Sequence, residues 1–315
     1  MKKLLLIDAY AMIYRAFHAL PPMSNKAGVP TNAVYGFFMI LQKTITLFQP
    51  SHIVVCFDTA APTFRKELYK EYRATRKEPD PTLIPQFDLV EKLLEASGIK
   101  CIGMPGYEAD DVIGSVATQF RKDFDSVFIL TGDKDLLQLS DKKTNVIFPK
   151  KGVSEFTLYT PEEVKNKLGV DPGHVADYKA LAGDASDNYN TAKGIGPKSA
   201  LALLAQYPTV EELLEHTDEI KNEKWRAILV EYKDTILLFK KLATIVCDLE
   251  MNVKVDDMEY TGFGPNLEKE LDTLQLYSLK AKLFSLPAPV KEKPVKPVKK
   301  VEEKTTKDQM DLFTN

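Results

Sequence analysis

Short apolar runs and longer helical patterns alternate along the first half of the chain. The apolar runs are continuous, which is typical of strands buried on both faces of a sheet. The predicted strands are Leu4–Asp8, Ile53–Asp58, Lys100–Met104, Val127–Thr131 and Val146–Phe148. The predicted helices between them are Thr31–Phe48, Pro81–Ser97 and Ala109–Arg121. This order predicts an α/β fold with a mostly parallel central sheet flanked by helices.

The pattern becomes mainly helical after residue 160. Thr160 and Pro161 form a typical helix start, with a capping side chain followed by proline at the first helical position. Further helices are expected over Pro172–Ala182, Pro197–Gln206, Thr209–His216 and Asp234–Val246. From Pro287 the chain is rich in Pro, Lys and Glu, a composition that cannot bury enough apolar surface to fold. We therefore expect an α/β core in residues 1–160, a helical region in 161–286 and a disordered tail in 287–315.

Composition excludes several classes of protein. The 315 residues carry 42 Lys+Arg and 45 Asp+Glu, and 44% are hydrophobic, as in ordinary globular proteins. No apolar run approaches the roughly 18 residues that would span a bilayer, so we expect a cytoplasmic protein without a membrane segment. The three cysteines lie far apart and form no Cys-x-x-Cys pair, which argues against a disulfide framework or a zinc site.

Acidic residues follow the predicted strands. Asp8 and Asp58 end the first two, and further acids follow the later strands and one helix of the helical region: Glu108, Asp110, Asp111, Asp133, Asp135, Asp184 and Asp187. Ligands of open parallel sheets bind beyond the carboxyl ends of the strands, so these side chains should converge there. Any single acid could equally be a solvated turn residue. The set favours convergence, because five separate segments contribute to it.

Converging carboxylates repel one another and need positive charge nearby. Lys134 is the main cation beside them in the sequence, and no His or Cys cluster accompanies them. Hard divalent cations with oxygen ligands, Mg²⁺ or Mn²⁺, are therefore the expected partners. Two such ions roughly 3.5–4 Å apart activate water and stabilise the leaving oxygen in phosphodiester hydrolysis.

Four ordered acidic motifs carry a family resemblance. They are Leu4 to Tyr10, Gly106 to Gly114, Thr131 to Leu136 and Gly183 to Asn188. In this order they resemble the 5′ nuclease (flap endonuclease) family, and are most similar to the N-terminal 5′-3′ exonuclease domain of bacterial DNA polymerase I and its stand-alone relatives. The resemblance covers about residues 1–285. It implies a PIN-like core with a helical arch around residues 63–97 and a helix-hairpin-helix-type element in 183–206.

The resemblance also implies roles for the acids. Asp8, Asp58, Glu108, Asp110, Asp111 and Asp133 would hold one of two Mg²⁺ or Mn²⁺ ions or its waters. Asp135, Asp184 and Asp187 would hold the other, with Asp133 shared. Arg73 stands where the family has a Lys that contacts the scissile phosphate, so Arg73, Asp58 and Asp133 are assigned to the catalytic step.

Two stretches are candidates for DNA contacts. Residues 64–77 interleave bases with aromatics at helical spacing; alone, this pattern is more typical of a solvated helix face, but the resemblance implies the arch over the active site. The second stretch is a glycine turn that opens a helix and, in the family, often binds K⁺. Tyr189 to Lys193 departs from the family sequence just before this turn. The expected DNA contacts are Arg65, Lys70, Tyr72, Arg73, Arg76, Gly194, Gly196 and Lys198.

The tail ends in residues that resemble the motif by which bacterial replication proteins dock on the sliding clamp, here Gln309, Leu312 and Phe313. Together these features predict a monomeric, structure-specific 5′-3′ exonuclease or 5′ flap endonuclease. Its substrates would be DNA with 5′ flaps, nicks or RNA-primed ends. The alternatives are an RNA-directed or non-catalytic PIN-like protein and a clamp-tethered DNA-binding module. The presence of all nine carboxylates disfavours the non-catalytic alternatives.

Overall fold

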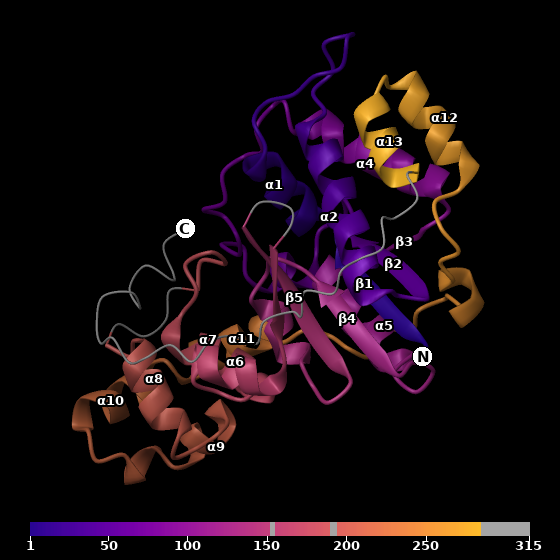
Figure 1. The fold of residues 1–315 in the computed structure, drawn as a ribbon. Helices are drawn as coiled ribbons and strands as arrows, with labels where there is room; N and C mark the ends of the chain where they lie inside the picture. Colours follow the sequence, from indigo (N-terminus) through magenta and orange to yellow (C-terminus); the bar gives the residue numbers. More distant parts are fainter. Residues whose placement is uncertain (152–154, 190–193, 285–315) are drawn as a thin grey trace.

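A six-stranded sheet forms the centre of the molecule (Figure 1). The structure is a computed structural model that describes residues 1–151, 155–189 and 194–284. The strand order is β3-β2-β1-β4-β5-β6, and only the β5–β6 pair is antiparallel. The strands are β1 (Lys3–Asp8), β2 (His52–Phe57), β3 (Lys100–Gly103), β4 (Ser126–Leu130), β5 (Thr144–Lys151) and β6 (Glu155–Tyr159). The predicted α/β fold with a mostly parallel sheet is confirmed.

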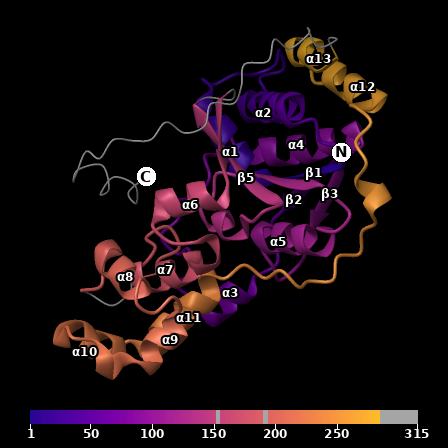
Figure 2. The ribbon, with the colours of Figure 1, turned by 60° about the horizontal axis from the view of Figure 1, so that its bottom comes forward.

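Alternate residues of the strands face two hydrophobic cores. Leu5 and Ile7 belong to one core, and Leu4 and Leu6 to the other. The first core is covered by helices α1 (Ala9–Ala19), α2 (Asn32–Phe48), α4 (Ile84–Ser97), α12 (Pro265–Thr273) and α13 (Tyr277–Phe284). Helix α5 (Ala109–Gln119) covers the opposite face (Figure 2). Burial on both faces explains why the strands are continuously apolar.

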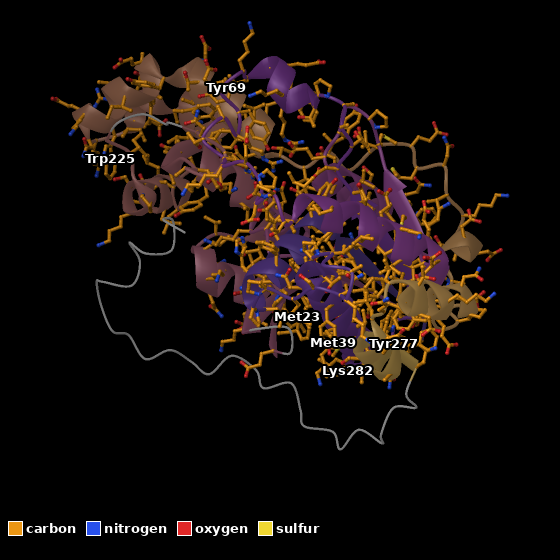
Figure 3. All side chains as sticks on the ribbon, turned by 90° about the horizontal axis from the view of Figure 1, so that it is seen from above. Met23, Met39, Tyr69, Trp225, Tyr277 and Lys282 are labelled. Carbon is orange, nitrogen blue, oxygen red and sulfur yellow. The ribbon has the colours of Figure 1, made fainter. Side chains whose placement is uncertain are left out.

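A helical lobe, residues 161–243, continues the second core. It contains α6 (Pro161–Leu168), α7 (Val175–Ala182), α8 (Pro197–Leu204), α9 (Val210–Glu215), α10 (Glu223–Glu231) and α11 (Lys233–Ala243). Figure 3 places Tyr69 and Trp225 at this end of the molecule, away from Tyr277 and Lys282. The short 3₁₀ helices are Asp135–Leu139, Pro172–His174, Thr217–Glu219 and Val255–Met258.

Several elements differ from those expected. Helix α1, strand β6 and helices α10, α12 and α13 were not predicted. Helices α12 and α13 pack on α4 and α2, so they extend the α/β core although they lie within the expected helical region 161–286. Between residues 64 and 77 only α3 (Phe64–Leu68) is helical. Helical periodicity therefore overestimates the helix in this stretch.

No helix in the described ranges is long and apolar enough to cross a membrane. The predicted tail and its clamp residues Gln309, Leu312 and Phe313 lie outside the described residues, as does the segment 190–193 before the glycine turn.

Candidate active site

A cavity of about 980 Å³ opens at the carboxyl edge of the sheet. Asp8 ends β1 and caps α1: its Oδ1 accepts from the Ala11 N–H at 3.1 Å and its Oδ2 from the Thr131 hydroxyl at 2.8 Å. The Asp58 Oδ1 accepts from the Ala109 N–H at 2.8 Å, at the start of α5. Five predicted acids line the cavity and are called here the first acid group: Asp8, Asp58, Glu108, Asp110 and Asp133.

Burial makes the ionised form costly for three of these acids, Asp8, Glu108 and Asp110. Burial, together with the nearby carboxylates of Asp133 and Asp58, raises the pKa of Asp8 to about 7, although the hydrogen bonds from Ala11 and Thr131 oppose the rise. Burial likewise raises the pKa of Asp110 and of Glu108. Oxygen-only ligands that repel one another in a water-accessible cavity fit hard divalent cations such as Mg²⁺ and Mn²⁺.

Asp135, Asp184 and Asp187 form a second acid group, with one oxygen of each within 4.8 Å of the others. Lys179, on α7, forms ion pairs with both Asp135 and Asp184. Burial alone would raise the pKa of Asp184, but the Lys179 ammonium and the hydrogen bonds from Ser186 hold it below its ordinary value. These three acids therefore gather apart from the five that line the cavity.

Arg73 lies between the two acid groups. Its Nη1 is 3.0 Å from Glu108 Oε1, and its Nε donates to Asp187 Oδ1 at 3.1 Å. The Arg76 Nη2 donates to the same Asp187 oxygen at 3.1 Å. Arg73 adopts a left-handed backbone with φ of 54°, and its N–H donates to the Asp187 carbonyl at 3.2 Å. The backbone contact and the two guanidinium contacts hold the predicted catalytic Arg in this unusual conformation.

Two predicted site residues instead form a buried structural pair. Arg65 donates to both oxygens of Asp111, at 2.6 and 2.8 Å, and the two residues are only 3% and 0% exposed. Asp111 also accepts from the Glu108 N–H, which fixes the start of α5. The expectation of Arg65 as a DNA contact and Asp111 as a metal ligand is therefore corrected: the pair is sealed from both.

Tyr72 is also placed differently from the expectation. It is 4% exposed, and its hydroxyl donates to Glu108 Oε2 at 3.1 Å. Its ring stacks on Tyr189, with the centroids 6.1 Å apart. Because both contacts turn the ring into the core, Tyr72 orients Glu108 in this structure and offers no free face to a base.

The remaining expected DNA contacts are accessible. Lys70 and Arg76 are exposed, and Arg76 lines the cavity. Gly194, Gly196 and Lys198 are exposed around the start of α8. Gly196 is the N-cap of α8, and Pro197 is its first residue. Gly194 has φ of 121°, and a Cβ there would lie 2.7 Å from Ile228, so glycine is required at this position.

Sequence reasoning missed the cavity residues on α1 and Lys179 on α7. Tyr10, Tyr14 and His18 line the cavity from successive turns of α1, and Phe87 contacts both tyrosine rings. Their i, i+4, i+8 spacing directly after the acid of β1 was the available signal. Lys179, five residues before Asp184, had a similar signal: it lies in the last turn of a predicted helix, just before an acidic motif.

Two family models and several curated proteins match this chain. The family described as "5'-3' exonuclease, N-terminal resolvase-like domain" matches residues 3–169, and "5'-3' exonuclease, C-terminal SAM fold" matches residues 170–266. A protein named "5'-3' exonuclease" from Bacillus subtilis is 39% identical over 282 residues, 88% of this chain and 94% of the relative. "DNA polymerase I" of the same organism is 45% identical over 84% of this chain, which spans 30% of that relative.

Solved structures share the fold. A structure titled "Divalent metal ions (zinc) bound to T5 5'-exonuclease" has a TM-score of 0.65 at 19% identity, covering 87% of this chain and 99% of the other. The catalytic core of Rad2 in complex with a DNA substrate has a TM-score of 0.54 at 20% identity, covering 91% and 88%.

Proposed function

The chain belongs to the 5′-3′ exonuclease family, and on that premise we propose that it hydrolyses DNA phosphodiesters at 5′ flaps, nicks and RNA-primed ends. The observation that carries the proposal is the gathering of two acid groups at one edge of the sheet, with Arg73 between them. Carboxylates that hold a pair of divalent cations are a recurrent arrangement for the hydrolysis of phosphodiesters.

The residues fit a pair of Mg²⁺ or Mn²⁺ ions. The first acid group would hold one ion and the second acid group the other, with Asp133 shared between the two ions. When bound, such ions supply Lewis-acid activation of water and stabilise the leaving oxygen. Thr131 and the Ala11 N–H hold the Asp8 carboxylate, and Ala109 holds that of Asp58, so both are oriented before an ion arrives.

Arg73 can stabilise charge on the reacting phosphate. Its guanidinium carries donors that already reach carboxylates of both acid groups. A phosphate seated between the groups would meet the same donors, whose planar fork suits its oxygens. Arg76, half exposed at the cavity rim, would contact the next phosphate.

The single strand would leave the cavity along α1. Tyr10, Tyr14 and His18 lie on one face of the helix, about 6 Å apart along its axis. This spacing matches an extended strand whose bases stack on aromatic rings. Photocrosslinking of a 5-iodouracil placed in the flap tests the path: crosslinks at Tyr14 are expected, and crosslinks confined to other faces would exclude it.

The duplex would rest on the start of α8. Exposed N–H groups at Gly196 and the Lys198 ammonium provide a seat for backbone phosphates, with K⁺ as an additional bridge. Neither feature reads base edges, so recognition would follow DNA structure and not sequence.

The clamp motif and the monomeric, cytoplasmic state remain parts of the proposal. Gln309, Leu312 and Phe313 would tether the nuclease to a sliding clamp. Deleting residues 309–315 should abolish clamp binding in a pull-down while cleavage of naked flaps continues; unchanged clamp binding would exclude the motif.

The central experiment measures cleavage of a 5′-labelled flap with Mg²⁺ and with chelator. We expect cleavage to require the metal and Asp133→Asn to slow it roughly 100-fold or more. Asp141→Asn is the matched control, because Asp141 pairs with Arg121 on the surface, outside the cavity. Undiminished cleavage by Asp133→Asn would refute the site. Preference for single-stranded RNA over the flap would favour an RNA-directed protein instead.

A further inference from the structure

Lys179 occupies the position between two carboxylates that a cation would take. It projects from the last turn of α7, and its side chain is 12% exposed. Its ammonium pairs with Asp135 and with Asp184, which come from separate segments of the chain. The oxygens of these two acids and of Asp187 are already close enough to share one ion.

The two acid groups differ in the cations that the chain itself provides. Lys179, Arg73 and Arg76 together contact all three carboxylates of the second group. In the first group Glu108 faces Arg73 and Arg65, whereas the other four carboxylates form no ion pair with a Lys or Arg in the described part of the chain. Among the described residues, cations of the chain therefore pair with every carboxylate of the second group, but only with Glu108 in the first group.

We propose that Lys179 is a positioning residue that substitutes for the second divalent cation and must be displaced from Asp135 and Asp184 before that ion binds. This inference rests on the proposed two-ion function. An ion that enters the first group finds uncompensated carboxylates. An ion that enters the second group must first break the ion pairs of Lys179, so its affinity is lowered by their free energy.

Because only the second site requires the displacement of Lys179, the two sites should differ in their affinity for the metal. The first ion binds tightly, and the second binds in a weaker class that fills only at higher metal concentration. Removal of the Lys179 charge should strengthen the weaker class and leave the tight class unchanged. A lysine that only supported the fold would not selectively strengthen metal binding when it is replaced.

The test is Mn²⁺ binding to the full chain, followed by the electron paramagnetic resonance signal of free Mn²⁺. For Lys179→Met we expect two bound ions. The affinity of the weak class for Mn²⁺ should rise by about tenfold or more, and each factor of ten corresponds to about 1.4 kcal/mol. Lys179→Arg keeps the charge and should keep the weak class weak. The matched control is Lys165→Met, which removes a Lys from a surface ion pair with Asp171 and should shift neither class.

The inference would be overturned if Lys179→Met still bound two ions but its weak class bound Mn²⁺ with unchanged or lower affinity. Binding of fewer than two ions by the unmodified protein would instead refute the proposed function.

A second measurement needs no variant. Acetylation of Lys179 by a succinimide ester, read by mass spectrometry, should rise when saturating Mn²⁺ is added, while acetylation of Lys165 stays constant. Equal acetylation of Lys179 with and without Mn²⁺ would also overturn the inference.

Discussion

Replacing Arg65 by methionine tests whether this residue supports the fold or contacts DNA. All three guanidinium nitrogens of Arg65 donate hydrogen bonds within the protein. Besides its two bonds to Asp111, it donates to the carbonyls of Leu242 at 2.7 Å and Thr244 at 3.0 Å, at the end of α11. It therefore ties α3 to α5 and to the helical lobe. Arg65→Met removes all of these donors at once.

The expected loss is large because Asp111 stays behind. Breaking a buried ion pair by removing one partner costs about 3–5 kcal/mol, since the remaining charge is uncompensated. The two carbonyls each lose a donor as well, but contributions within one network do not add. We expect a fall of about 4 kcal/mol in the free energy of unfolding. Arg65→Lys should fall nearly as far, because an ammonium cannot supply the planar fork.

Urea denaturation followed by circular dichroism measures this loss. Arg121→Met is the control, because its pair with Asp141 is half exposed and should contribute at most about 1 kcal/mol. The double variant Arg65→Met/Asp111→Leu should recover part of the loss, since it removes the unpaired charge. If Arg65→Met lost less than about 1 kcal/mol while DNA affinity fell, the structural role would be refuted and the DNA contact reinstated.

Two further predictions concern the first acid group and helix α1. Because the pKa of Asp8 is raised from 3.8 to about 7, the folded state holds its proton more tightly than the unfolded state. Without metal, the free energy of unfolding should therefore fall by roughly 2–4 kcal/mol between pH 4 and pH 7. Added Mg²⁺ should remove this fall. If the metal-free protein became more stable over this pH range, the raised pKa of Asp8 would be contradicted. Gly36→Ala should lower the free energy of unfolding by about 1–2 kcal/mol, because the added Cβ would lie 2.8 Å from the Cβ of Ala16. Gly173→Ala is the control, because a Cβ there would meet nothing within 4 Å. Equal melting temperatures for the two variants would show that α1 can shift to make room.

Much of the fold was predictable because its signals are local. Continuous apolar strands that end in acids identify the sheet and the edge where the site forms, and Asp8, Asp58, Glu108, Asp110 and Asp133 do line one cavity. Thr31, predicted at the start of a helix, is the N-cap of α2.

The remainder depends on contacts between distant segments. The spacing of residues 64–77 is helical, yet α3 ends at Leu68. Arg73 lies outside it, where Asp187, 114 residues later in the chain, binds its backbone and its side chain. Charge alone could not show that Arg65 points inward to Asp111 while Arg76 stays exposed. The pairing of Lys179 with Asp135 and Asp184 was not predictable either, since these residues are brought together only in three dimensions.

The placement of β1 in the sheet governs when the acids can meet during synthesis. The first strand made lies between β2 and β4, so it gains its second neighbour only after residue 130 has emerged. Asp184 and Asp187 follow later still, and α12 and α13 close over α2 and α4 last. Such long-range pairing slows folding, because distant segments must be joined before their contacts are made. A chain that ended before Asp187 would therefore lack an assembled centre, and cutting activity would arise only once the segments that carry both acid groups had left the ribosome.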